Sequence, residues 1–251
     1  WSVIFLDVDL DGFEDLLAAT GHMFDPQDID AQARIAAKGP YPQSMIPKKL
    51  LMLPPLAQAK LAFRNRGNLT FAECGKAWGF DQVGVSQGMA LADLDNDGDL
   101  DVVVNNLNGV ASLYRNDAPG GRIGVRLKGA PPNTHGIGAR IRLVGGSVTQ
   151  SQEMICGGRY MSGDQATRVF ATDATSDKPM RVEVTWRNGK RSVIENARAN
   201  RVYEIDETPD GRAVKATVLR SGSRHTMDIT PEPGGRTLAQ AMPEVGREVR
   251  E

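Results

Sequence analysis

The chain has 251 residues, of which 40% are hydrophobic, and this is enough for one large or two ordinary domains with packed cores. Thirty basic and thirty-one acidic residues leave a formal net charge of -1, so no overall field attracts nucleic acid or an anionic membrane, and charge matters only locally. No apolar run reaches the ~20 residues that span a bilayer, which excludes a transmembrane helix.

The first predicted element is an apolar strand from Val3 to Leu6, and the chain opens into it at Trp1 rather than at a methionine. We therefore expect a fragment whose natural N-terminus, together with any export signal, lies upstream. The lack of a signal pattern in these residues says nothing about the compartment.

An acidic loop follows this strand and returns later in the chain. Residues 7–15 read D-V-D-L-D-G-F-E-D and residues 93–101 read D-L-D-N-D-G-D-L-D, each between short aliphatic or β-branched runs. A second repeated motif follows each loop: Phe63-Arg64-Asn65 and Tyr114-Arg115-Asn116 share the pattern aromatic-Arg-Asn, and both read as the end of a strand. The chain therefore contains an internal repeat of strand units, which stack because one unit cannot bury its own apolar face.

The residue types in the two loops match the needs of a calcium ion, which takes six to eight oxygen ligands at about 2.3 to 2.6 Å. Positions one, three, five and nine of each loop offer carboxylates, position seven offers a backbone carbonyl, and the glycine at position six permits the sharp turn. We predict two Ca²⁺ sites with the ligands Asp7, Asp9, Asp11, Phe13 and Asp15 in the first loop, and Asp93, Asp95, Asp97, Asp99 and Asp101 in the second.

Two other interpretations of the loops are weaker. An EF-hand needs a glutamate at position twelve between two helices, whereas position twelve is Ala18 or Val104 between short apolar runs. Solvated acidic turns are the plainer alternative. However, two carboxylates about 4 Å apart repel by roughly 4 kcal/mol at an effective dielectric near 20, so four in one loop favour a bound cation. Magnesium fits less well because it prefers rigid octahedral sites that keep several waters.

A proline-rich insertion over residues 22–60 interrupts the first repeat. Within it, Ile29, Ala33 and Ala36 recur at helical spacing and predict one helix over residues 27–38, which the following Gly-Pro pair would stop. We expect the insertion to cover one face of the repeat as a lid or a loop.

A linker at residues 118–121 leads into a second β-rich unit. Residues 137–143 and 182–186 alternate between apolar and polar side chains, as half-buried strands do. The Asn188-Gly189 pair predicts a hairpin whose two turn residues both reach positive φ. Strand signals weaken from residue 207, so we expect a poorly ordered tail over residues 207–251.

No catalytic constellation is visible, so we do not expect an enzyme. Gly136-Ile137-Gly138 lacks the third glycine of a dinucleotide fingerprint and reads as part of a packed strand. The two cysteines, Cys74 and Cys156, have no C-x-x-C neighbour, which excludes thiolate zinc sites. Two free thiols are the commoner state of such a pair, and one long-range disulfide is the alternative.

At this point the motifs resemble known families. The two acidic loops with their Phe-Arg-Asn and Tyr-Arg-Asn echoes resemble FG-GAP (VCBS-type) repeats, which are the blades of integrin-like β-propellers. The later segments, from Asn133 to Arg140, from Gly158 to Ser162 and from Val184 to Gly189, resemble the ASPIC/UnbV domain. Their order is similar to that in the CRTAC-like (cartilage acidic protein) family, in which ASPIC/UnbV follows the last blades.

Two segments depart from the family pattern. Phe170-Ala171-Thr172-Asp173 stands where the family often has Phe-Gly-Leu-Gly, and Trp186-Arg187-Asn188-Gly189 replaces Trp-Pro-x-Gly. These changes put fine details of the domain in doubt, but not its identity.

The resemblance implies an all-β fold, in which a partial integrin-like propeller of about two FG-GAP blades precedes a small ASPIC/UnbV domain and a flexible tail. Its expected divisions are residues 1–117, 118–206 and 207–251. A closed propeller needs at least four blades, so we expect the remaining blades upstream. The family also implies a secreted, periplasmic or cell-surface protein.

Our leading hypothesis is an extracytoplasmic interaction or adhesion module whose blade loops are held by structural calcium. Its partner, a protein or a glycan, cannot be named from the sequence. The alternative is a non-catalytic accessory region of a larger secreted enzyme or carbohydrate-binding protein, whose active site lies upstream.

Overall fold

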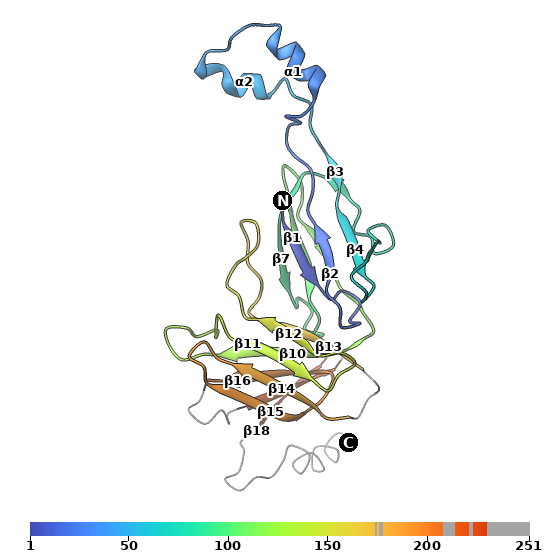
Figure 1. Ribbon diagram of the computed structural model, residues 1–251, viewed down its shortest axis with the longest axis vertical. Coiled ribbons are helices and arrows are strands. Elements are labelled where there is room, and N and C mark those ends of the chain that lie inside the picture. Colours follow the sequence, from blue (N-terminus) through green and yellow to red (C-terminus); the bar gives the residue numbers. More distant parts are fainter. Residues whose placement is uncertain (174, 176–177, 208–213, 221–222, 230–251) are drawn as a thin grey trace.

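The computed structural model describes residues 1–173, 175, 178–207, 214–220 and 223–229. Figure 1 shows a helical head at one end, two β-sheets below it, and a pair of larger sheets at the other end. No helix among these described residues is long and apolar enough to cross a membrane.

The first unit consists of two antiparallel sheets that carry the repeats. The first sheet has the order β1-β2-β4-β5 and the second has the order β7-β8-β9. Their strands are β1 (Val3–Leu6), β2 (Asp15–Ala18), β4 (Leu61–Asn65), β5 (Phe71–Glu73), β7 (Ser86–Ala92), β8 (Asp101–Asn106) and β9 (Ser112–Tyr114). A short pair, β3 (Gln58–Ala59) with β6 (Val83–Gly84), lies beside them.

One apolar core joins the two sheets. Ile4, Leu6 and Leu17 come from the first sheet, and Met89 and Leu91 come from the second. All five side chains are at least nine-tenths buried. Because side chains alternate along a strand, β1 presents its other side chains away from this core.

The insertion forms the helical head, which we define as residues 22–57. Its base is closed by a pair of backbone hydrogen bonds between His22 and Leu56. The head contains α1 (Ile29–Ala36), a 3-10 turn η1 (Gln43–Met45) and α2 (Ile46–Leu50). The helix predicted over residues 27–38 is therefore confirmed, with Asp28 as its N-cap at 2.7 Å from the amide of Ala31. The second helix was not predicted, because five residues are too few to show a period.

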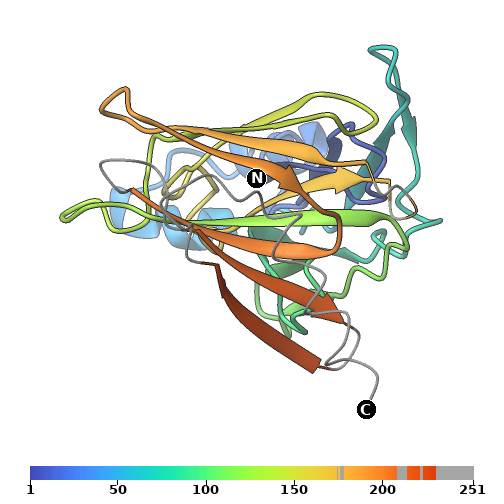
Figure 2. The ribbon, with the colours of Figure 1, turned by 90° about the horizontal axis from the view of Figure 1, so that it is seen from below.

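The second unit is a sandwich of two sheets. One has the order β13-β10-β16-β17-β18 and the other the order β12-β11-β14-β15. Figure 2 shows β17 and β18 extending one sheet beyond its partner. The strands are β10 (Gly121–Lys128), β11 (Arg140–Val144), β12 (Gln150–Glu153), β13 (Arg168–Thr172), β14 (Met180–Thr185), β15 (Arg191–Ala197), β16 (Arg201–Asp206), β17 (Val214–Arg220) and β18 (Ser223–Ile229).

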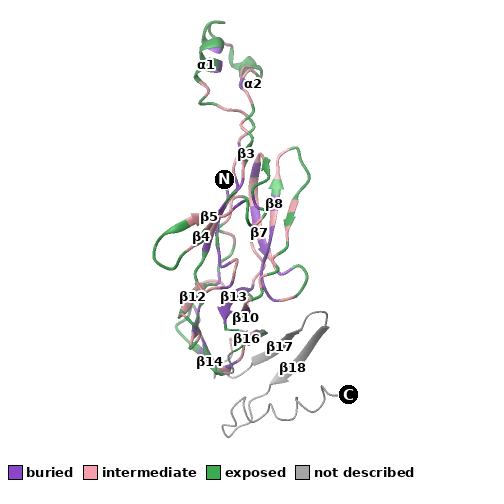
Figure 3. Cartoon of the chain, turned by 90° about the vertical axis from the view of Figure 1, so that its right-hand side faces the viewer, coloured by how far each residue is buried: buried purple, intermediate pink, exposed green. Residues whose placement is uncertain are grey.

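The core of the sandwich lies between its two sheets. Ile123 and Tyr203 contribute from one sheet, and Ile141, Val182 and Val184 contribute from the other. All of these side chains are fully buried. Figure 3 shows buried residues, in purple, within strands of both units, and the burial patterns of β7 and β14 alternate along the strand.

The all-β fold class predicted from the sequence is confirmed, and none of the sheets formed by the described residues closes into a ring. Both cysteines are free, as expected for the commoner state.

Three local predictions differ from the structure. Residues 137 and 138 form a turn, and the strand begins only at Arg140, because Gly136 and Gly138 both take positive φ. In the turn between β14 and β15, residues 186–190, only Gly189 has positive φ, since the turn is longer than two residues and the Gly189 amide bonds to the Trp186 carbonyl. The tail expected from residue 207 instead includes β17, which pairs with β16, and β18, which pairs with β17, and residues 230–251 lie outside the described residues.

Candidate metal centres

The two acidic loops have the same backbone conformation. Their fourth residues, Leu10 and Asn96, have φ of 57° and 64°, and their sixth residues, Gly12 and Gly98, have φ of 97° and 98°. Left-handed backbone at two positions curls each loop back over itself, and glycine accepts the second of these positions without strain. The sequence repeat is therefore also a repeat in three dimensions.

Two backbone amides at equivalent positions hold the ninth aspartate of each loop. Asp15 accepts hydrogen bonds from Val8 at 2.9 Å and from Asn65 at 2.8 Å. Asp101 accepts them from Leu94 and Asn116, both at 2.8 Å. These bonds explain the Phe-Arg-Asn and Tyr-Arg-Asn echoes, whose asparagine amides close the loops. Each carboxylate oxygen keeps a second lone pair that a cation can use.

Three carboxylates of each loop come together at its mouth. The ligand atoms of Asp7, Asp9 and Asp11 lie within 4.8 Å of one another, and so do those of the second-loop residues 93, 95 and 97. The ninth aspartates lie outside these triads. The structure thus brings together the first three carboxylates predicted for each site.

Several buried carboxylate oxygens in the loops have no hydrogen-bond partner. They are Oδ1 of Asp9, Oδ1 of Asp93 and both oxygens of Asp99. Asp93 is 9% exposed and Asp99 is 1% exposed, so water does not readily solvate them. A buried acceptor without a donor is costly. An all-oxygen set with unused acceptors fits a hard cation, because calcium takes oxygen ligands.

Burial also changes the protonation of these groups. It raises the pKa of Asp7 to about 7 and that of Asp15 to about 6, against the lowering effect of the backbone amides. Burial likewise raises the pKa of Asp99 to about 8, with Arg122 opposing the shift. The pKa values of Asp9 and Asp93 are raised for the same reason. Without a cation, burial therefore favours the protonated form of these five carboxylates.

An arginine neutralises part of the charge in each loop. Nε of Arg64 lies 2.6 Å from Oδ2 of Asp9, and Nη2 lies 3.5 Å from Oδ2 of Asp11. Nη2 of Arg122 lies 2.8 Å from Oδ2 of Asp97, and its guanidinium also donates to the Asp97 carbonyl. The sequence does not predict the contact between Arg122 and the second loop, because Arg122 belongs to β10 of the second unit.

The predicted seventh-position ligands are placed differently from each other. The amide of Phe13 donates to Asp11 at 2.9 Å, and its ring is 36% exposed. Asp99 instead points a buried carboxylate toward Arg122, 3.6 Å away. The second loop therefore has an aspartate at position seven, where the first loop has Phe13.

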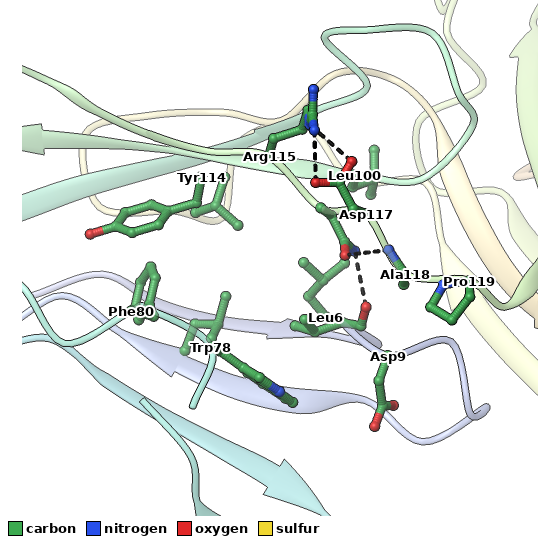
Figure 4. Close-up of a pocket in the computed structure, with 14 residues that line it drawn as sticks. Leu6, Asp9, Trp78, Phe80, Leu100, Tyr114, Arg115, Asp117, Ala118 and Pro119 are labelled. Atoms are coloured by element: carbon green, nitrogen blue, oxygen red, sulfur yellow. Dashed lines mark hydrogen bonds and ion pairs between the residues drawn. The ribbon is translucent and has the colours of Figure 1, made fainter. Parts of the chain in front are cut away.

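A cavity of about 340 Å³ lies between the two sheets of the first unit. Trp78, Phe80 and Tyr114 form its aromatic wall, and Figure 4 shows Asp9 and the Arg115–Asp117 ion pair on opposite sides of the cavity, away from the Phe80 and Tyr114 rings. The ring centroids of Phe80 and Tyr114 lie 4.7 Å apart. None of its lining residues pairs a nucleophile with a base.

Both loops lie against the second unit. A side chain at Gly12 would meet Val148 at 2.4 Å, and one at Gly120 would meet Leu10 at 2.6 Å. The edge of β7 is also covered, because Gln165 donates to the Leu91 carbonyl at 2.8 Å. The candidate sites thus lie where the two units meet.

Comparison with known proteins gives one family and one distant structure. Residues 129–212 match the ASPIC and UnbV family model. No curated protein matches the chain. A protein from Bacteroides ovatus proposed to act in cell adhesion is similar over 70% of each chain, with 9% identity and a TM-score of 0.25. At that score the similarity supports no conclusion about fold or function.

Proposed function

We propose that this chain is a non-enzymatic interaction module whose two repeat loops each bind a structural Ca²⁺ ion. The observation that carries the proposal is the set of buried carboxylate oxygens on Asp9, Asp93 and Asp99 that accept no hydrogen bond. Repetition adds weight, since two loops with the same backbone and the same closing hydrogen bonds arise at equivalent places.

Charge supports a cation in addition to the arginines. The second loop carries five aspartates at residues 93–101, whereas Arg122 supplies one positive charge at 13% exposure. Carboxylates within 4.8 Å of one another repel strongly in a partly buried site. A divalent ion removes that repulsion and uses the free acceptors, so it stabilises the folded loop.

We also propose that the two sheets of the first unit are consecutive FG-GAP blades of an integrin-like propeller, as in the CRTAC-like arrangement. The support is a pair of equivalent positions that differ in burial. Phe5 and Leu91 both precede their loops by two residues, yet Phe5 is 53% exposed and Leu91 is 3% exposed. The first sheet covers Leu91, and a preceding blade would cover Phe5 in the same way.

We propose that two calcium-binding blades followed by an ASPIC/UnbV-like domain act in interaction or adhesion outside the cytoplasm. The match to the ASPIC and UnbV family supports it, together with the resemblance of the loops to FG-GAP repeats. We infer that the calcium ions hold the loops rather than react, because two backbone amides close each loop on its ninth aspartate beside the triad.

Calcium titration tests this proposal. We expect binding of two Ca²⁺ ions per chain by calorimetry in metal-free buffer, and a melting temperature that rises with free Ca²⁺, because a ligand of the native state stabilises it. An unchanged melting temperature in EGTA and in excess Ca²⁺ would refute the proposal.

Matched variants locate the ions. Asp9→Asn and Asp95→Asn should each remove about one of the two binding events, since each takes a carboxylate from one triad. Asp81→Asn is the control, because Asp81 is an exposed carboxylate outside both loops. Loss of binding in the control would show that the ions bind elsewhere.

A further inference from the structure

The helical head carries apolar side chains that its own small core does not use. That core contains Ala31, Ile35 and Leu53. Four other apolar residues of the head remain open: Met45 is 42% exposed, Ile46 47%, Leu50 42% and Leu51 73%. Ile46 and Leu50 are four residues apart on α2 and therefore share a face.

The charge of this part of the head has one sign. Residues 31–57 contain Arg34, Lys38, Lys48 and Lys49 and no aspartate or glutamate, although the whole chain has a net charge of -1. Lys48 is exposed, and Lys49 is half-buried. The two lysines lie between Ile46 and Leu50 in the sequence of α2, so cationic and apolar groups occupy the same turn.

The head is also placed where a large surface can reach it. Figure 1 shows α1 and α2 at the end of the molecule opposite the second unit, joined to the sheets by two connecting segments. Figure 3 shows the same end as mostly exposed. A flat partner could therefore contact the tip without meeting the sheets.

We propose that the tip of the head, made of Met45, Ile46, Leu50 and Leu51 with Lys48 and Lys49, docks on an anionic lipid surface. Exposed apolar side chains bind at the boundary between headgroups and acyl chains, and adjacent lysines are attracted to anionic headgroups. A neutral membrane would leave the lysines without a counter-charge. An apolar protein groove would desolvate them, which is costly.

Vesicle co-sedimentation with the full chain tests the proposal. We expect binding to vesicles of phosphatidylglycerol and phosphatidylcholine, at least tenfold weaker binding to phosphatidylcholine alone, and a loss of binding as NaCl is raised. Equal binding to both vesicles, or binding to neither, would overturn it.

Two variants test the named residues. Leu50→Asp with Leu51→Asp, and separately Lys48→Glu with Lys49→Glu, should each weaken binding to anionic vesicles at least tenfold. Their circular dichroism should match the parent chain, because these side chains lie outside the buried core of the head. Undiminished binding by either variant would overturn the proposal.

Matched controls separate the tip from the rest of the surface. Ile29→Asp changes an apolar residue that is 81% exposed but lies beside Asp28 and Asp30, and Lys76→Glu changes an exposed lysine far from the head in sequence. Both controls should bind like the parent. If they lose binding equally, or if the tip variants instead turn a dimer into a monomer by sedimentation, the lipid surface is not the partner.

Discussion

Asp101 combines two roles that a sequence motif does not separate. The sequence places it as the ninth ligand of a calcium loop, while the structure shows both of its oxygens accepting backbone amides. At 1% exposure, it closes the loop through bonds to the protein's own amides. Asp95 is exposed, belongs to the triad and accepts one exposed hydrogen bond, from the Asp97 amide at 3.3 Å. The two aspartates should therefore respond differently to substitution.

We predict that Asp101→Ala lowers the free energy of unfolding by about 2–4 kcal/mol even in EGTA, because it leaves two partly buried amides unpaired. Asp95→Ala should leave the apo stability within about 0.5 kcal/mol, as expected for a surface change, yet weaken calcium binding. Urea denaturation with and without Ca²⁺ measures both effects. Equal losses in EGTA would show that the ninth aspartate has no separate structural role.

A pH dependence follows from the raised pKa values. Burial raises the pKa of Asp7 to about 7, from 3.8 for an ordinary aspartate, so protonation favours the folded state. This contribution is fully present below about pH 4 and is lost as the pH rises through about 7. In metal-free buffer, the melting temperature should therefore fall between pH 5 and pH 8, and the deprotonation of Asp7 should contribute to this fall. Saturating Ca²⁺ should reduce this fall, because the ion favours the ionised carboxylates.

Asp7→Asn is the matched variant for this prediction. It removes the titrating group while keeping one of the two oxygens that accept from backbone amides, since the Asp11 amide donates to Oδ1 at 3.0 Å and the Gly12 amide to Oδ2 at 2.8 Å. Melting curves at four pH values should show a shallower slope in the variant. An unchanged slope would assign the pH dependence to other groups.

At the scale of the strand, the two repeats have the same register but different neighbours. Phe5 pairs with Leu16 across β1 and β2, and Leu91 pairs with Val102 across β7 and β8. The first pair lies on the outer face of its sheet, where Phe5 is exposed, and the second lies in the core between the sheets. Stability at these equivalent positions should therefore depend on the neighbour and not on the motif.

We predict that Leu91→Ala costs about 2–5 kcal/mol, because it removes a fully packed side chain. Phe5→Ala should cost less than about 1 kcal/mol in this chain, because its ring is 53% exposed. Chemical denaturation of the two variants measures the difference. If a preceding blade covers the outer face, Phe5→Ala becomes as costly as Leu91→Ala once that blade is present.

The same comparison shows how far the sequence alone can lead. Period-two alternation predicts most strands, and the Asp-Gly spacing predicts the loops and their carboxylate triads, because both patterns are local. The partners of those loops are not local. Arg122 reaches Asp97 from another unit, and Asn116 reaches the Val8 carbonyl from 108 residues away. The turn at Gly138 and the strands after residue 213 depend on pairing that local propensity does not encode.

At the scale of the whole molecule, the two loops lie at the junction between the units. Arg122 lies in β10, and its guanidinium forms an ion pair with Asp97 of the second loop. Gly12 of the first loop lies against Val148. Ordering either loop should therefore also hold the sandwich in place. This coupling needs no change in shape, only contacts that exist when both parts are folded.

Tryptophan fluorescence can detect that coupling, since Trp1 and Trp78 lie in the first unit and Trp186 lies in the core of the second. With Trp1→Phe and Trp78→Phe in place, emission reports on the sandwich alone. We predict that Ca²⁺ raises the urea midpoint seen by Trp186, although every predicted ligand is in the first unit. Arg122→Leu should reduce that rise, because it removes the bond to Asp97. A midpoint insensitive to Ca²⁺ would mean that the units unfold independently, and the loops would then stabilise only the sheets that carry them.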